Sequence, residues 1–123
     1  MTDDKKTKQI NAGHKFDGDK ERFDLLPVKP LMRLAALFAQ GAKKYDARTW
    51  EKGIAFGRLF AAMVRHAWKW WGGEKYDPID GQHHLTAVMW NAMCLQELEE
   101  THPELDDRDP QNIRFKDSDK GYK

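Results

Sequence analysis

The sequence predicts an all-α fold: a small bundle of three main helices with an extended N-terminal arm, completed by self-association. Three stretches place apolar residues at three-to-four spacing, which is the periodicity of a helix with one buried face. Prolines and glycines separate these stretches and set their ends. The 123 residues favour one domain. A chain of that size buries only about 60 to 65% of its unfolded surface, which favours a homo-oligomer, a dimer or a tetramer.

The first helix is expected over residues 30–45, opened by Pro30, and the second over residues 56–71, ended by Gly72-Gly73. The third is expected from residue 81 or 82 to residue 100, before Pro103. The predicted apolar stripes are Leu31, Leu34, Ala35, Leu37, Phe38, Ala42 and Tyr45 in the first helix; Leu59, Phe60, Met63, Val64, Ala67 and Trp71 in the second; and Leu85, Val88, Met89, Ala92, Leu95 and Leu98 in the third.

The ends of the chain are polar, so the sequence predicts a disordered lead-in over residues 1–14 and a helical domain over 15–100. Residues 101–123 are expected to be a polar, mobile tail or an arm that orders only across a subunit contact. Residues 15–30 read as an arm laid along the body, because Pro27 and Pro30 are expected to prevent a continuous helix before residue 30.

Charge and cysteine content exclude several classes of protein. The 21 basic residues nearly balance the 20 acidic ones, which argues against a partner of duplex nucleic acid. The one cysteine, Cys94, lies in an apolar helical pattern and is expected to be a small buried hydrophobe. No signal peptide and no apolar run of about 18 residues is found, so we expect a cytoplasmic protein without a membrane partner.

The stretch from residue 65 to residue 91 gathers most of the chemically useful side chains. The Gly72-Gly73 break divides it, so the sequence predicts a helix, a polar loop and a second helix whose polar groups meet at the junction. A hairpin with a purely structural role would not require these groups. They are His66, Glu74, Asp77, Asp80, His83, His84 and Asn91.

Glu74 and Asp77 have an E-x-x-D spacing, which on a helical turn puts both carboxylates on one side. Two carboxylates that close are able to share a hard divalent cation. The alternative is a solvated acidic loop. Asp80 is expected to cap the third helix, because an aspartate side chain accepts hydrogen bonds from backbone N–H groups at a helix start.

His84 and Asn91 are seven residues apart and therefore share one face of the third helix. Burying an imidazole and an amide is costly unless each has a partner. A ligand is the preferred partner, and a metal shell or a mutual polar network are the alternatives. His66 lies near the edge of the second stripe, as a structural residue or as a ligand, and the neighbouring Arg65 favours a phosphate or carboxylate contact.

Basic and aromatic residues alternate over residues 42–53, which contain Lys44 and Trp50. This pattern suits a phosphorylated, flat-ringed ligand, because cations bind the phosphate while rings stack on the base. For Trp50 alone, a place in the core is the expectation. In the arm, Lys20 and Arg22 contact a phosphate or belong to a solvated loop.

Four blocks of the sequence carry a family resemblance. They are KFDGDKERFDLLP, GAKKYDARTWEKG, RHAWKWWGGEKYDPIDG with the following His83-His84-Leu85, and Asn91. Together, over residues 15 to about 98, they resemble the phage and prophage domain known as dATP/dGTP diphosphohydrolase, N-terminal, which is related to the MazG-like all-α nucleoside triphosphate pyrophosphohydrolases. The resemblance implies an oligomeric enzyme that hydrolyses a deoxynucleoside triphosphate, preferably a purine dNTP, to dNMP and pyrophosphate with Mg²⁺, with Mn²⁺ as the alternative.

The resemblance and the spacing together suggest roles for particular residues. Glu74 and Asp77 would hold the metal, and Asp80 or His84 would orient or deprotonate water. Asn91 would read a base or sugar edge. The residues that the resemblance carries over are Asp17, Lys20, Arg22, Asp24, Lys44, Tyr45, Trp50, Arg65, His66, Glu74, Asp77, His84 and Asn91. The phosphate or nucleotide contacts are expected from Lys20, Arg22, Lys44, Arg65 and His66, with Trp50 or Trp70 stacking on the base.

Two other functions remain open at the level of sequence. The MazG-like pattern pairs an E-x-x-E on one helix with an E-x-x-D on the next, and the first two predicted helices contain no E-x-x-E. A phage protein that binds and sequesters a nucleotide or cyclic nucleotide without turning it over is therefore the alternative. A helical interaction protein, with its tryptophans in the core and at an interface, is the third.

Overall fold

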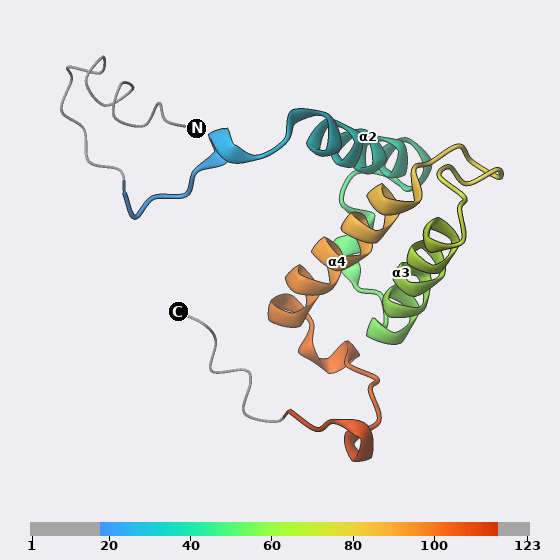
Figure 1. Ribbon diagram of the computed structural model, residues 1–123. Coiled ribbons are helices and arrows are strands. Elements are labelled where there is room, and N and C mark those ends of the chain that lie inside the picture. The colour runs from blue at the N-terminus through green and yellow to red at the C-terminus, as the bar shows by residue number, and fades with distance from the viewer. Residues whose placement is uncertain (1–17, 116–123) are drawn as a thin grey trace.

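Three helices form the body of the protein, which the computed structural model describes over residues 18–115 (Figure 1). They are α2 (Val28–Tyr45), α3 (Phe56–Trp71) and α4 (His84–Thr101). Short 3₁₀ turns lie at Phe23–Leu25, Thr49–Lys52, Pro103–Leu105 and Pro110–Asn112. The described residues contain no strand beyond one isolated antiparallel bridge between Tyr76 and His83. The predicted all-α class with three main helices is confirmed.

Helices α3 and α4 form an antiparallel pair, and α2 packs against α4 (Figure 1). The apolar core lies at one end of the pair, where Phe56 and Leu59 of α3 meet Cys94 and Leu98 of α4. The turn before α3 adds the ring of Trp50, which packs against Phe38 and Trp90 with centroids 6.0 and 6.5 Å away. The expected core position of Trp50 is confirmed. The other end of the pair, where α3 ends and α4 begins, holds polar side chains.

Two predicted helix starts are wrong by a few residues. Helix α2 begins at Val28, with Pro30 inside its first turn. The first N–H groups of a helix have no acceptor within the helix, so a proline there removes no hydrogen bond. Helix α4 begins at His84, because Gln82 and His83 belong to the bridged loop. Its N-cap is His83, whose Nδ1 accepts from the Leu85 N–H, and the expected capping by Asp80 is wrong.

The arm does not lie along the body. Its described part, residues 18–27, projects from the start of α2 (Figure 1). Phe23 is 76% exposed and Leu25 70% exposed, so the arm gains no apolar burial within this chain. The predicted lead-in over residues 1–14 lies outside the described residues, as does Asp17.

Part of the segment after residue 100, residues 102–107, packs against the body. Leu105 contacts the core, and the Asp107 carboxylate accepts a 2.7 Å hydrogen bond from the Gly57 N–H at the start of α3. A carboxylate suits this place, because the first N–H groups of a helix lack acceptors and carry partial positive charge. The expectation of a mobile tail is therefore wrong for residues 102–107. Within residues 18–115 we find no helix with the length and hydropathy that crossing a bilayer requires.

Helix α3 buries only part of the apolar stripe that its sequence predicts. Leu59 is 4% exposed, but Phe60, Val64 and Trp71 are 57, 44 and 75% exposed. Helix α4 and the 102–107 segment cover one side of α3, which is apolar on two, and leave these three side chains exposed. The prediction that all of them are buried is wrong for this chain on its own.

Candidate functional site

A sharp chain reversal at the end of α3 builds the polar end of the helix pair. The Gly72 N–H donates to the Trp68 carbonyl, and Gly73 takes a positive φ of 105° that favours glycine. The Glu74 N–H then donates to the Lys69 carbonyl at 3.0 Å, which is a helix-ending Schellman arrangement. Glu74 therefore begins the return toward α4.

The loop between the helices is fixed by its own backbone. The Asp77 N–H donates to the Gln82 carbonyl at 2.7 Å, and the Gly81 N–H, at a φ of 76°, donates to the Asp77 carbonyl at 2.7 Å. Asp77 Oδ1 accepts from the Ile79 N–H at 2.9 Å. These bonds hold Asp77 at only 7% exposure, between the two helices and not on a helical turn.

Three side chains from different segments meet at this place. His66 of α3 and His84 of α4 face each other with 2.9 Å between their Nδ1 atoms. Asp77 completes a group in which one donor atom of each residue lies within 4.8 Å of the others. On its other side, His84 Nε2 lies 2.8 Å from Glu74 Oε1. A carboxylate only accepts, so the His84 Nε2–H donates to Glu74 and the lone pair of His84 Nδ1 points at His66 and Asp77.

The surroundings favour the forms of these groups that bind metals. Burial lowers the pKa of His66, the neighbouring His84 lowers it further, and the Asp77 and Asp80 charges oppose the change. The hydrogen bond from the Ile79 N–H lowers the pKa of Asp77, with smaller contributions from Lys69 and both histidines, against the effect of burial. A neutral imidazole and an ionised carboxylate are the ligand forms of these residues.

The donor set fits a divalent transition-metal ion. Two nitrogens bound to one ion at about 2.1 Å lie about 3 Å apart when the angle at the ion is near 90°, and the His66 and His84 Nδ1 atoms are 2.9 Å apart. A carboxylate on the far nitrogen of a ligand histidine is a common support, because it fixes the ring and its tautomer. Two imidazoles with one carboxylate suit Mn²⁺, Zn²⁺ or Fe²⁺ better than Mg²⁺, which prefers oxygen ligands.

A groove of about 260 Å³ lies on the other side of the bridged loop, toward α2. His83 borders it and meets Tyr76 ring to edge at 5.5 Å, although the adjacent His84 belongs to the cluster. Arg33 is the one charged residue among the described residues that line the groove. Burial lowers the pKa of His83, and the charges of Arg33, Lys75 and His84 lower it further. Its lining residues are Arg33, Ala36, Leu37, Gln40, Tyr76, Gly81, Gln82, His83 and Thr86.

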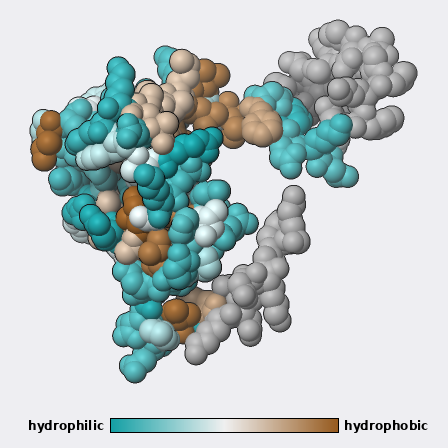
Figure 2. Space-filling view, turned by 180° about the vertical axis from the view of Figure 1, so that it is seen from behind, coloured by the Kyte–Doolittle hydropathy of each residue, from teal (hydrophilic) through white to brown (hydrophobic). Residues whose placement is uncertain are grey.

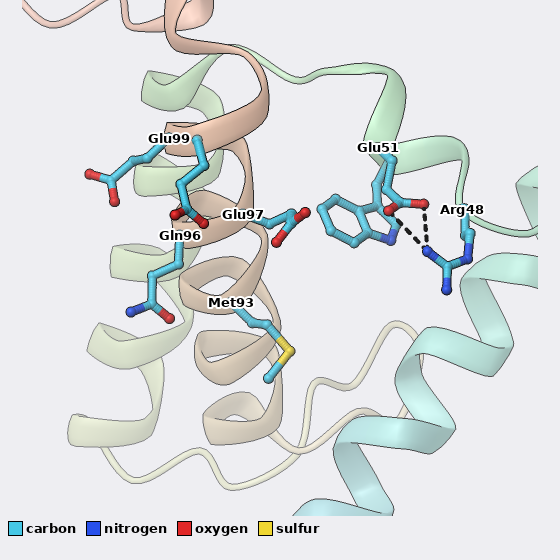
Figure 3. A pocket seen from close by; sticks show the side chains of 8 residues that line it. Arg48, Glu51, Met93, Gln96, Glu97 and Glu99 are labelled. Carbon is cyan, nitrogen blue, oxygen red and sulfur yellow. Dashed lines mark hydrogen bonds and ion pairs between the residues drawn. The ribbon is translucent and has the colours of Figure 1, made fainter.

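A larger open pocket of about 690 Å³ lies near the opposite end of α4 and is unsuited to a phosphate (Figure 3). Glu51, Glu97, Glu99 and Glu100 line it, and its one guanidinium, Arg48, is paired with Glu51 at 3.1 Å. An anion would meet four carboxylates there. The smaller groove is therefore the better candidate for a phosphorylated ligand.

The structure separates the predicted phosphate-binding residues. Lys20 and Arg22 lie on the projecting arm, where Arg22 pairs with Asp24 at 2.8 Å. Lys44 lies at the exposed end of α2, with its amine 5.1 Å from the Tyr45 ring centre. Of the five candidates, Arg65 and His66 lie next to or within the cluster, and the Arg65 charge acts on the pKa of His66.

The remaining predicted residues are also placed. Asn91 is buried as expected, and its amide donates to the Ala87 carbonyl of its own helix at 2.8 Å. Trp70, 40% exposed, lies beside Trp71 at the end of α3. Asp80 accepts from the Gln82 N–H at 3.0 Å within the loop. Both ring nitrogens of His84 have neighbours, Nε2 at Glu74 and Nδ1 at His66.

Sequence reasoning did not identify the groove. Arg33 and Gln40 come from α2, and Tyr76 and His83 from the loop, so no local motif links them. His66 did carry a signal, because it follows the buried Leu59 by seven residues and therefore shares its face.

The structure thus places a cluster of two histidines and a carboxylate at the junction of two helices of an all-α protein, with a groove lined by Arg33 beside it. The family model described as dATP/dGTP diphosphohydrolase, N-terminal, matches residues 10–108, and the chain belongs to this family. The match includes the 102–107 segment that packs on α3. The searches of curated proteins and of solved structures found no match. The family description supports a hydrolase that acts on a nucleotide.

Proposed function

We propose that this protein hydrolyses a purine deoxynucleoside triphosphate to the monophosphate and pyrophosphate, at a divalent cation held by His66, Asp77 and His84. The convergence of these three side chains, with Glu74 behind His84, is the observation that supports the proposal most strongly. Bound there, the cation would polarise phosphate oxygens and neutralise their charge. Its donor set favours Mn²⁺ over the Mg²⁺ that the family resemblance implies.

The groove beside the loop is the proposed nucleotide site. Its volume of about 260 Å³ lies just below the range of about 300 to 1,000 Å³ for small-molecule sites. It has room for the base or for the phosphate chain, and the rest of the nucleotide would cross the loop toward the cluster. Arg33 supplies a cation for a phosphate oxygen, and Tyr76 supplies a ring.

The reaction requires one water molecule. Its oxygen forms a bond to the α-phosphorus, the bond from the α-phosphorus to the bridging oxygen breaks, and pyrophosphate leaves with that electron pair. The proton of the water needs an acceptor. Solvent water is the proposed acceptor, because Glu74 is bonded to Nε2 of His84 and lies on the far side of that ring from the cluster.

Product analysis tests the proposal. The protein is incubated with each dNTP and with Mn²⁺ or Mg²⁺, and dNMP and pyrophosphate are separated. Pyrophosphate release with dGTP or dATP, faster with Mn²⁺, is the expected result. Asp77→Asn is expected to lower kcat at least 100-fold, whereas Asp109→Asn, in an exposed turn far along the chain, is expected to leave it unchanged.

A second pair of variants tests the groove. Arg33→Met is expected to raise KM for the nucleotide about 10-fold or more, the cost of a lost charge-assisted hydrogen bond. Lys29→Met, one turn earlier on α2, removes a similar charge outside the groove and is the matched control. Nucleotide-induced thermal stabilisation without any product, for every dNTP and both cations, would instead identify a protein that binds nucleotides without hydrolysis.

A further inference from the structure

Two apolar strips on the surface have no cover within the described residues, and we propose that they cover each other between two copies of this chain. The arm strip consists of Phe23, Leu25 and Leu26 with Val28 and Met32 at the start of α2. All five are between 45 and 76% exposed. Figure 2 shows apolar side chains along the segment that joins the body to the grey N-terminal residues. This inference does not depend on the proposed reaction.

The α3 strip is the outer face of that helix. Phe60, Val64, Trp68 and Trp71 follow each other at intervals of four, four and three residues, which places them on one face. They are 57, 44, 72 and 75% exposed. A contiguous apolar face of this size on a folded chain marks an interaction surface.

The arrangement of the chain favours exchange between copies. The arm leaves α2 on the side away from α3, so the two strips of one copy are not adjacent (Figure 1). Each copy thus carries one arm to donate and one strip to receive it.

The charges around the two strips are complementary. Helix α3 contains no acidic residue, and its exposed Arg65 and Lys69 each directly follow a member of the α3 strip. Residues 18–27 of the arm carry three acids, Asp19, Glu21 and Asp24, against the two bases Lys20 and Arg22, a net charge of −1. This slight negative charge and the basic borders of the strip would attract each other, whereas two basic-bordered α3 strips would not.

Reciprocal exchange also buries enough surface for a stable pair. A fully buried aromatic side chain contributes roughly 150 to 250 Å², and each copy offers four aromatic rings that are at least 57% exposed: Phe23, Phe60, Trp68 and Trp71. With the aliphatic members, two exchanged arms bury on the order of 1,200 Å² or more, the lower bound for specific interfaces. In a two-fold symmetric exchange, the arm strip and the α3 strip of both copies are covered.

Sedimentation of the full chain measures the association. The unaltered protein is expected at twice the chain mass. Trp68→Glu or Phe23→Glu is expected to reduce the mass to that of one chain while the helical circular dichroism is kept. Ile79→Glu replaces an apolar side chain that is 89% exposed and outside both strips, so it is expected to leave the mass unchanged. A monomeric unaltered protein, or association that survives both glutamate variants, overturns the proposal.

Crosslinking identifies the partner of the arm. A Phe23→Cys chain is mixed with a separately tagged Trp68→Cys chain under mild oxidation, and a disulfide between the two tags is expected. Cys94 is fully buried, so the introduced thiols are the accessible ones. An Ile79→Cys chain mixed with Trp68→Cys is the control that should not link. A chain that carries both Phe23→Cys and Trp68→Cys tests contact within one copy. If this double variant forms a disulfide within the chain and the mixture of single variants forms no link, the arm covers its own α3 and the second copy is ruled out.

Discussion

His84 is fully buried and uses both of its ring nitrogens, one toward Glu74 and the other toward His66. A buried imidazole with two such neighbours has a fixed orientation and a fixed tautomer. The residues around it therefore differ in what their loss should do. Asp77 supplies a donor atom to the cluster, whereas Glu74 acts through His84.

This difference predicts an order of cation affinities. Glu74→Gln keeps an oxygen that accepts from His84 but loses the charge, so Mn²⁺ affinity is expected to fall about 10-fold, the lower end for such supporting groups. Asp77→Asn is expected to lower it more than 100-fold, because the ionised ligand is lost. Calorimetric titration with Mn²⁺ measures both.

Asp109→Asn is the control for these titrations, because Asp109 accepts from the Gln111 N–H in an exposed turn away from the cluster. Its expected Mn²⁺ affinity is within about threefold of the unaltered protein, as for a surface charge outside the ligand set. Equal losses for Asp109→Asn and Asp77→Asn would contradict the assignment of the ligands.

Gly53 offers a second prediction at the residue scale. Its φ is 117°, and a Cβ there would lie 2.6 Å from Leu105 Cδ1. Gly53→Ala is expected to destabilise the protein by about 2 to 3 kcal/mol, from backbone strain together with displacement of Leu105. Urea unfolding measures the change.

Gly73→Ala separates the two causes. Gly73 also has a positive φ, of 105°, but a Cβ there meets nothing within 4 Å. Gly73→Ala is therefore expected to lower the free energy of unfolding by about 1 kcal/mol, from backbone strain alone. A Gly73 variant as unstable as the Gly53 variant would show that the contact with Leu105 contributes nothing.

The sequence correctly predicted the stretch of residues that contains the polar cluster, but not how the side chains are arranged in it. The run from residue 65 to residue 91 contains the whole cluster, and the shared buried face of His84 and Asn91 is confirmed. The pairing of Glu74 with Asp77 on a helical turn is wrong, because Gly72-Gly73 and the bridged loop place them on opposite sides of His84. Those positions depend on long-range backbone hydrogen bonds, which residue spacing does not encode.

At the scale of elements, α3 depends on a segment that lies far along the chain. Asp107 accepts from the Gly57 N–H across a separation of 50 residues, and Leu105 packs beside it. This contact fills the place of an N-cap, since Ala55, the residue at that position, offers no side-chain acceptor.

Asp107→Ala is therefore expected to lower the free energy of unfolding by about 1 kcal/mol, the usual value of a lost helix cap. Urea unfolding followed by circular dichroism measures it. Asp109→Ala removes a carboxylate that accepts only from the Gln111 N–H nearby within the described residues and is expected to change stability by less than half as much. Equal effects of the two substitutions would indicate that Asp107 does not cap α3.

The sequence correctly predicted the presence of the three helices, but not the residues at which two of them begin. The three apolar periodicities correctly predicted α2, α3 and α4. The start of α2 was missed because proline is harmless in a first turn, and the start of α4 because the Tyr76–His83 bridge takes up the preceding residues. The outer face of α3 was assigned to the core, since apolar spacing shows that a face is buried without showing which molecule buries it.

At the scale of the molecule, the proposed cation would join α3, the loop and α4. Because the ligands are far apart in an unfolded chain, the ion would bind the folded state and stabilise it. At a Mn²⁺ concentration of 100 times Kd the gain is about 2.7 kcal/mol, which for a domain of this size corresponds to a Tm increase of about 10 °C or more. Differential scanning calorimetry with and without Mn²⁺ measures it.

The same calorimetry on Asp77→Asn shows whether the proposed site causes the increase in Tm. Its Tm is expected to remain unchanged on addition of Mn²⁺. An equal rise in both proteins would assign the stabilisation to ions bound elsewhere.

The overall class was within reach of sequence reasoning because local periodicity determines helices. The position of the arm was not, since its apolar residues find no partner within the chain and their burial is not a property of one copy. The packing of residues 102–107 was also missed. Their composition is polar and typical of a mobile tail, although Leu105 and Asp107 contact the body.

Cys94 is a native labelling site that reports transient opening of the core. It is the one thiol of the chain, it is 0% exposed at the centre of the core, and burial raises its pKa to about 12. A thiol-reactive dye can label it only when α3 and α4 part, so the labelling rate reports how often the hairpin opens. The frequency with which α3 and α4 separate is therefore measurable on the unaltered protein, without an introduced cysteine.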